Sequence, residues 1–356
     1  MMRMILAPLM VLLMAAAPLK PAPVPVGPPA PPIIIAHRGA SAERPEHTLA
    51  AYERAIEQGA DFIEPDLVPT KDHQLVARHE SEISGTTDVA TRAEFAARKA
   101  TKTIDGEAMT GWFTEDFTLA ELKTLRAKER LPQLRPANAA FDGQFEIPTL
   151  AEIIALAKSA SSRTGRTIGI YPETKHPTYF RAIGLPLEPV LLRELAAAGW
   201  TTREAPVFIQ SFEVDNLKAL KGQTGVRLIQ LMGSTGKSAD GYDYAALASA
   251  EGLKAVAAYA AGIGPERVMI IPRGPDGRLA QPTSLVRDAH AVGLEVHPWT
   301  FRPENYFLPE GLKSGPDPRA AGDVDSEIRT YLATGIDGLF SDSTAAAVKA
   351  LAQPQR

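Results

Sequence analysis

The sequence predicts an α/β fold, a TIM-barrel-like (β/α)8 fold with an insertion after the third strand. From Ile33 onward, short runs rich in β-branched apolar residues alternate with segments of helical periodicity. Runs that are apolar throughout are typical of strands buried on both faces, as in a parallel sheet, and helices between them supply the crossovers that such a sheet needs. No glycine-rich dinucleotide-binding motif follows the first run, so we favour a barrel over an open doubly wound sheet.

Nine runs fit strands, one more than an eight-stranded barrel needs. They are 33–38, 61–67, 74–79, 168–173, 207–212, 227–232, 268–272, 295–299 and 338–342. The second and third are joined only by PTKDH, which is too short for a right-handed crossover helix. One of this pair can therefore be a hairpin arm in place of a barrel strand.

The helices are indicated by apolar stripes and by their ends. One stripe ends at Gly59 and consists of Leu49, Tyr52, Ala55 and Ile56. Thr149 and Glu152 fit a capping box that opens a helix through Lys158. A second capping box is expected at Thr118 and Glu121, and a further helix at 282–292.

Residues 80–147 contain no run that fits a buried strand. The stretch is polar and lies between the third run and the Thr149 helix. A loop of this length inside a compact domain is uncommon unless it is functional. We interpret 80–147 as an inserted subdomain or long cap within a barrel domain that spans 33–352.

The N-terminal residues predict export. Residues 1–17 combine Arg3 with an apolar stretch that ends in three alanines, as a signal peptide does, and this stretch is too short to span a bilayer comfortably. Residues 18–32, eight of them proline, predict a stiff linker. We expect a periplasmic or secreted protein without a transmembrane domain after signal removal. An uncleaved N-terminal anchor is the alternative, and Pro18 leaves the cleavage site open.

The composition argues against several classes of function. The 356 residues are 45% hydrophobic with a net charge of −4, which gives no reason to expect nucleic-acid binding. The chain contains no cysteine, so disulfides, thiol catalysis and structural zinc are excluded.

Three carboxylates follow successive strands. Glu64 and Asp66 are two residues apart near the end of the second run, so both face the same side, and Glu173 with Lys175 repeats this arrangement. Active sites of parallel barrels lie at these carboxyl ends. Each acid alone fits a salt bridge, but three that converge cannot all stay ionised without a cation. Oxygen ligands without cysteine favour Ca²⁺ or Mg²⁺.

Two histidines end neighbouring strands beside these acids. His37 and His79 could each be a packed residue, but together they offer the pair that general acid–base catalysis needs. Arg38 and Lys175 would then neutralise a phosphate, or pair with the acids when no ligand is bound. His47 is expected near the start of the first helix, outside this set, and His297 has no evident partner. Phe212 and Trp299 fit either a substrate edge or the core.

An ordered set of motifs resembles the glycerophosphodiester phosphodiesterase family. The motifs are HRGAS at 37–41, PEHT at 45–48, EPDL at 64–67, HE at 79–80, YPETK at 171–175, QSF at 210–212, HPWT at 297–300 and GIDGLFSD at 335–342. AAYAAGIGP at 257–265 resembles the periplasmic type in particular. The resemblance extends over nearly all of residues 33–350.

The resemblance implies a distorted TIM barrel and hydrolysis of glycerophosphodiesters to sn-glycerol 3-phosphate and an alcohol. It implies that Glu64, Asp66 and Glu173 hold a divalent cation, with Ca²⁺ favoured over Mg²⁺ for an exported protein. His37 and His79 would be the acid and base. Arg38 and Lys175 would hold the phosphate. The family mechanism starts with a hydroxyl of the substrate's own glycerol and passes through a cyclic phosphate that water opens.

Two other functions remain open at this point. A phosphodiesterase acting on lysophospholipid or sphingomyelin would use the same centre but would need an apolar channel for the acyl chain. A surface-binding protein on the same scaffold would have no need for both histidines and all three acids. The alcohol specificity and the oligomeric state do not follow from the sequence.

Overall fold

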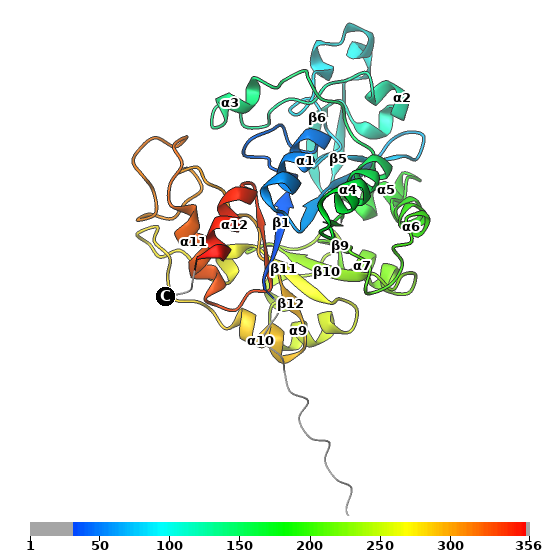
Figure 1. Ribbon diagram of the computed structural model, residues 1–356. Coiled ribbons are helices and arrows are strands. Elements are labelled where there is room, and N and C mark those ends of the chain that lie inside the picture. The colour runs from blue at the N-terminus through cyan, green and yellow to red at the C-terminus, as the bar shows by residue number, and fades with distance from the viewer. Residues whose placement is uncertain (1–30, 354–356) are drawn as a thin grey trace, which may run out of the picture. The chain divides into compact units, whose positions relative to one another are not determined.

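The computed structural model describes residues 31–353 and has a closed barrel of parallel strands at its centre (Figure 1). In order around the barrel, its strands are β1 (Ile33–His37), β2 (Phe62–Glu64) with β3 (Asp66–Pro69), β7 (Gly169–Ile170) with β8 (Glu173–Thr174), β9 (Phe208–Ser211), β10 (Arg227–Met232), β11 (Gly262–Pro265), β12 (Glu295–Val296) and β13 (Gly338–Ser341). β13 pairs in parallel with β1, and the Asp337 N–H donates to Val296 O at 3.0 Å beside β12. The predicted barrel fold is confirmed.

Two predicted strands are interrupted at a proline. Pro65 separates β2 from β3, and Pro172 lies between β7 and β8. Proline has no N–H to contribute to a strand ladder, so each ladder stops there and resumes on the far side. β2 pairs with β7 and β3 pairs with β8, which keeps the two halves of each strand in the same place in the barrel.

The third predicted strand is a hairpin arm. β4 (Leu75–Ala77) runs antiparallel to β3, with Leu67 opposite Ala77 and Pro69 opposite Leu75. The short connection between the second and third runs thus makes a hairpin, and β4 takes no place in the parallel ring. The insertion begins just after this arm.

The predicted strand at 268–272 is wrong. The barrel strand lies earlier, at β11, and Arg267–Met269 form a 3-10 turn. Glycine and proline are depleted in strands, so the sequence GIGP did not suggest one. Packing requires glycine at 262, because a Cβ there would come within 2.6 Å of Glu295 O, whereas one at Gly264 would displace the end of the Leu231 side chain, whose Cδ2 would be 2.6 Å away.

Helices surround the barrel. They are α1 (Leu49–Gln58), α4 (Leu150–Thr164), α5 (Pro177–Ala182), α6 (Glu188–Ala197), α7 (Val214–Lys221), α8 (Tyr244–Leu247), α9 (Ala250–Ala257), α10 (Leu285–Ala291), α11 (Val324–Leu332) and α12 (Thr344–Ala352). α1 ends at Gly59, whose φ of 110° is left-handed, and both halves of the Thr149 capping box are present at the start of α4. Within residues 31–353, no helix is long and apolar enough to cross a membrane.

The inserted residues 80–147 contain little regular structure. They form the antiparallel hairpin of β5 (Ala100–Ile104) and β6 (Glu107–Gly111), the short helices α2 (Leu119–Leu122) and α3 (Pro136–Ala139), and the 3-10 turns Val89–Thr91, Ala93–Arg98 and Thr114–Asp116. α2 follows the predicted capping box of Thr118 and Glu121. Most of β5 and β6 is exposed or half-buried, which explains why no buried strand was evident. In Figure 1 these elements lie beyond the arrowhead of β1.

Two apolar clusters support the site. The larger packs the helices against the outside of the barrel. The smaller fills the barrel interior and consists of Ile35, Phe62, Tyr171, Phe208, Ile229 and Phe340. Side chains alternate along a strand, so Ile35 shares a face with His37, Phe62 with Glu64 and Phe208 with Gln210. The interior cluster therefore packs directly below the polar residues that lie on the same faces of these strands.

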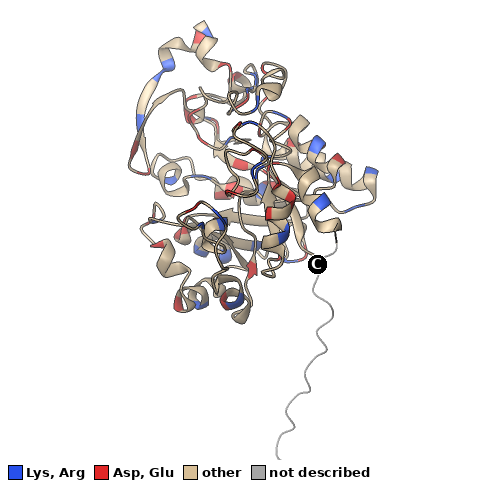
Figure 2. Cartoon of the chain, turned by 90° about the vertical axis from the view of Figure 1, so that its left-hand side faces the viewer, with Lys and Arg blue, Asp and Glu red and all other residues tan. Residues whose placement is uncertain are grey.

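Acidic and basic residues are interspersed over the elements in the view of Figure 2. This mixture agrees with the small net charge of −4. Strong local charge is instead concentrated at the carboxyl ends of the barrel strands, where acids and bases are buried together.

Candidate active site

Strand register brings the chemically active side chains together. In the parallel ladders, His37 lies beside Glu64, Asp66 beside Glu173, and Glu173 beside Gln210. These residues belong to four consecutive positions of the barrel: His37 and Glu64 end β1 and β2, whereas Asp66 and Glu173 begin β3 and β8, directly after the prolines that interrupt the two strands. The convergence expected from the sequence is thus a direct consequence of parallel pairing.

A cavity of about 350 Å³ opens at this end of the barrel. All nine residues singled out in the sequence line it: His37, Arg38, Glu64, Asp66, His79, Glu173, Lys175, Phe212 and Trp299. It is also lined by residues that the sequence did not single out: Gln210, Leu231, Thr300, Arg302 and Phe340.

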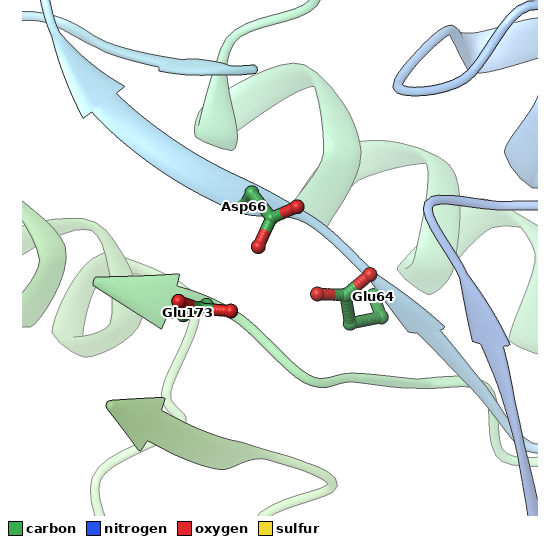
Figure 3. Close-up of side chains that lie close together, drawn as sticks. All are labelled: Glu64, Asp66 and Glu173. Carbon is green, nitrogen blue, oxygen red and sulfur yellow. The ribbon is translucent and has the colours of Figure 1, made fainter. Parts of the chain in front are cut away.

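The three carboxylates form a tight group (Figure 3). One oxygen from each of Glu64, Asp66 and Glu173 lies within 4.8 Å of the other two, and all three residues are buried. Glu64 accepts hydrogen bonds from the Arg38 N–H at 2.8 Å and from Gln210 Nε2 at 3.1 Å. Asp66 Oδ2 is 2.9 Å from His47 Nε2, and Glu173 Oε1 is 2.9 Å from Lys175 Nζ.

The pKa values of the three acids are shifted in different directions. Burial, with the neighbouring Asp66, raises the pKa of Glu64 well above its usual range. Burial also raises the pKa of Glu173 to about 8, with Asp66 adding to the shift and Lys175 opposing it. For Asp66, burial is outweighed by Lys175, His79 and His47, so its pKa lies well below the ordinary value. Three carboxylates at this separation cannot all ionise unless further positive charge is present.

The donor set fits a hard divalent cation. Asp66 Oδ1 is buried and has no hydrogen-bond partner, although its carboxylate lies close to those of the other two acids. A buried carboxylate oxygen without a partner is costly unless a ligand completes its coordination. Carboxylate oxygens are the preferred ligands of Ca²⁺ and Mg²⁺. These three residues could therefore hold such an ion, which would release the protons of Glu64 and Glu173.

His37 is held by an aspartate from the last strand. Its Nδ1 lies 2.6 Å from Asp342 Oδ1, and both side chains are buried. Because the ionised carboxylate of Asp342 accepts a hydrogen bond from the Nδ1–H group, the neutral ring has its lone pair on Nε2, the nitrogen available for proton transfer. Burial and the nearby Arg38 lower the pKa of His37 to about 4, although Asp342 acts in the opposite direction.

His79 has a matching partner. Its Nδ1 contacts Glu80 Oε1, the carboxylate of the next residue along the chain. The His79 side chain is 30% exposed, more than that of His37 at 11%. Burial and the positive charges of Arg38 and Lys175 lower its pKa, so a neutral ring is favoured there too.

Arg38 and Lys175 contact acidic residues, and such pairing is one of the two arrangements expected from the sequence. Arg38 Nε lies 3.4 Å from Asp66 Oδ2, and Arg38 NH1 donates to Glu46 at 3.1 Å. Nearby Glu46 and Asp66 raise the pKa of Arg38 despite its burial. Arg38 and Lys175 therefore keep their charge and line the cavity, where an anionic group would meet both.

Phe212 and Trp299 form part of the cavity wall. Their rings meet edge to face with centroids 5.8 Å apart, and Trp299 Nε1 donates to Gly264 O at 2.8 Å. Lys175 Nζ lies 5.9 Å from the centre of the Phe212 ring. Both aromatics are thus fixed in place beside the charged residues, in a position to contact the apolar edge of a ligand.

Several supporting residues were missed in the sequence. His47 lies next to the start of α1, as expected. Its ring also contacts the site: Nε2 is hydrogen-bonded to Asp66, and Nδ1 lies 2.8 Å from Tyr52 OH. Gln210 and Asp342 stood in recognisable motifs but had no evident partner. Their contacts join residues 146 and 305 positions apart in the chain. Only the register of the strands could have revealed them.

Comparison with known proteins decides the family. The model described as "Glycerophosphoryl diester phosphodiesterase family" matches residues 37–346. The chain belongs to this family. Over 327 residues it is 38% identical to glycerophosphodiester phosphodiesterase GDPD6 of Arabidopsis thaliana, covering 88% of this chain and 84% of that protein. It is also 32% identical over 305 residues to the glycerophosphodiester phosphodiesterase of Haemophilus influenzae, covering 78% and 80%.

Solved structures agree on the fold. An Oleispira antarctica phosphodiesterase in complex with the product sn-glycerol-3-phosphate superposes with a TM-score of 0.60 and 19% identity, covering 91% of this chain and 98% of that one. At this identity the likeness demonstrates the fold alone. The family match and the named relatives make this protein an enzyme of the glycerophosphodiester phosphodiesterase class.

Proposed function

We propose that the protein hydrolyses glycerophosphodiesters to sn-glycerol 3-phosphate and an alcohol in the cavity that His37, Arg38 and Lys175 line. The observation that carries this proposal is the convergence of all seven charged or titratable residues picked from the sequence on one cavity. The Oleispira phosphodiesterase that binds sn-glycerol-3-phosphate has the same fold, which supports a small glycerophosphate ligand.

Metal dependence is part of the proposal. Glu64, Asp66 and Glu173 would hold the ion, which when bound supplies positive charge that stabilises the phosphate in the transition state. The buried oxygen of Asp66 without a partner supports this assignment. We favour Ca²⁺ over Mg²⁺, because Ca²⁺ tolerates irregular carboxylate geometry and is abundant outside the cell.

His37 and His79 would act as the acid–base pair. One accepts the proton of a glycerol hydroxyl as its oxygen forms a bond to phosphorus. The other, protonated on Nε2 at this stage, donates that proton to the alcohol oxygen as its bond to phosphorus breaks, leaving a cyclic phosphate. Water then attacks phosphorus: the second histidine takes a proton from the water, and the first returns its proton to the glycerol oxygen as the ring opens. Arg38 and Lys175 would bind the phosphoryl oxygens during both steps.

The test is to identify the products by ³¹P NMR after incubation with glycerophosphocholine and divalent cation. We expect glycerol 3-phosphate and free choline, since the bond broken is between phosphorus and the alcohol oxygen. Phosphocholine and glycerol as products would contradict the proposal. Faster cleavage of lysophosphatidylcholine or sphingomyelin would favour the lipid substrates, and no turnover of any diester would favour a binding protein.

We further propose that the enzyme is exported, as the signal-like residues 1–17 and the proline-rich residues 18–32 indicate. Both stretches lie outside the described residues, apart from the last two prolines. N-terminal sequencing of the protein recovered from the producing cells tests this directly. Cleavage near residues 15–20 is expected; exported protein that still begins at Met1 would favour the uncleaved anchor, and recovery of the protein only from the cytoplasm would contradict export.

A further inference from the structure

Each histidine of the site is attached to a carboxylate through the same ring nitrogen. His37 Nδ1 meets Asp342 Oδ1, and His79 Nδ1 meets Glu80 Oε1. A carboxylate in this place selects the tautomer and fixes the plane of the ring. The two histidines are therefore oriented by two separate acids, from opposite ends of the sequence.

Each of these carboxylates is in turn held by an arginine of the inserted residues 80–147. Arg135 NH2 donates to Asp342 Oδ2 at 2.6 Å. Arg130 NH1 donates to Glu80 Oε1 at 3.1 Å, and its NH2 donates to Glu80 Oε2 at 2.6 Å. The result is two chains of the same kind, each running from histidine to carboxylate to arginine.

Arg135 is anchored on more than one side. Its Nε donates to Glu304 at 2.6 Å and its NH1 to Ser41 O at 2.9 Å, so all three nitrogens of the guanidinium are used. The side chains of Arg135, Asp342 and Glu304 are only 6%, 4% and 7% exposed. In such a dry position a charged hydrogen bond is strong, and leaving one partner without the other is costly. Arg302 also reaches Asp342, at 3.1 Å.

Arg130 contacts two carboxylates near the site, Glu80 and Glu46. Besides Glu80, it contacts Glu46 through Nε at 2.8 Å and NH2 at 2.7 Å. Glu46 accepts a hydrogen bond from Arg38, the proposed phosphate ligand. Arg130 thus holds the carboxylate partner of His79 and the carboxylate partner of Arg38 with one guanidinium group.

We propose that the insertion completes the active centre through two positioning residues, Arg135 for His37 and Arg130 for His79. This inference rests on the proposed function, because it takes these histidines as the acid–base pair. Neither arginine is among the residues that line the cavity. Their role is to keep each carboxylate in place, so that each imidazole presents Nε2 to the substrate in the right tautomer.

The test compares Arg135→Ala with Arg98→Ala. Arg98 is a matched control, since it also lies in the insertion and pairs with a carboxylate, Glu121, but neither residue lines the cavity or contacts a residue of the two histidine chains. We expect Arg135→Ala to lower kcat by about 10- to 100-fold with KM changed less than about threefold, and Arg98→Ala to leave both unchanged. Equal kcat for the two variants would overturn the proposal.

A double-mutant cycle separates positioning from general structural support. If Arg135 acts through Asp342, then Arg135→Ala should cost little further kcat in an Asp342→Asn background. Arg130→Ala and Glu80→Gln form the second cycle, with the same expectation. Losses that multiply in both cycles would show that the arginines act independently of the carboxylates, and the proposal would fail.

Two further variants keep the result interpretable. If Arg135→Ala does not fold, Arg135→Lys retains the charge but cannot hold Glu304, Asp342 and Ser41 O together, so kcat should still fall; unchanged kcat would contradict the proposal. His37→Ala tests the underlying function. Full turnover by His37→Ala would remove the acid–base assignment itself, whereas loss in His37→Ala with none in Arg135→Ala would remove only the present inference.

Discussion

His297 is buried inside the barrel beside the aromatic residues that support the site. It is 1% exposed, its Nδ1 lies 2.8 Å from Tyr171 OH, and its ring meets that of Phe208 edge to face. From the sequence it had no evident partner. Burial lowers its pKa to about 4, from an ordinary value near 6.5.

This histidine predicts a pH dependence of stability. The unfolded chain takes up the proton below about pH 6.5, while the folded protein resists it until about pH 4, so the free energy of unfolding should fall between these values. The contribution is fully present above pH 7, and its size is about 3 kcal/mol. Urea unfolding at a series of pH values measures it.

His297→Gln is the matched variant, since glutamine stays uncharged throughout. Its stability should decline less than that of the wild type between pH 6.5 and 4. The comparison is needed because the pKa values of His37 and His47 are also lowered. Parallel curves for the two proteins would show that His297 does not titrate as described.

Prediction from chain order identified residues that the structure brings together. Glu64, Asp66 and Glu173 follow apolar runs, and a parallel barrel brings the ends of such runs together. It failed where a role depends on a distant partner. Asp342 directly follows the last strand and touches His37 only because β13 closes against β1, and Arg135 reaches it from the residue before the short helix α3.

At the level of elements, the pattern predicted most strands and helices because burial on both faces leaves a continuous apolar run. The errors have identifiable causes. β11 was missed because tight packing against β10 and β12 requires glycine where β-branched residues were expected. β4 looked like any other apolar run, and only the length of the connection before it indicated a hairpin.

The strands and helices of the insertion could not be predicted from sequence periodicity. Its hairpin β5–β6 is largely exposed and its helices have four residues each, so neither gives a clear repeat. Its order comes instead from long-range contacts, such as those of Arg130 with Glu46 and of Arg135 with Glu304. The sequence indicates a long segment without buried strands at this place, but it does not indicate the contacts that Arg130 and Arg135 make with Glu80 and Asp342.

At the scale of the whole molecule, the barrel and the insertion supply different residues of the proposed site. The barrel supplies the three acids, His37, Arg38 and Lys175 above an apolar interior, and His79 follows the hairpin arm β4. Arg130 and Arg135 of the insertion contact two of the supporting carboxylates, Glu80 and Asp342. Family membership covers residues 37–346 and so includes both parts.

The most direct test of this reading is the release of glycerol 3-phosphate from glycerophosphocholine by chelator-treated protein, before and after Ca²⁺ is added, with Glu173→Gln alongside. Removing the metal should abolish turnover and Ca²⁺ should restore it. Glu173→Gln should require at least about 10-fold more Ca²⁺ for half-maximal rate, because an amide replaces one of three charged ligands. Undiminished turnover by the chelated wild-type protein, or an unchanged Ca²⁺ requirement in Glu173→Gln, would contradict a metal centre built from these three acids.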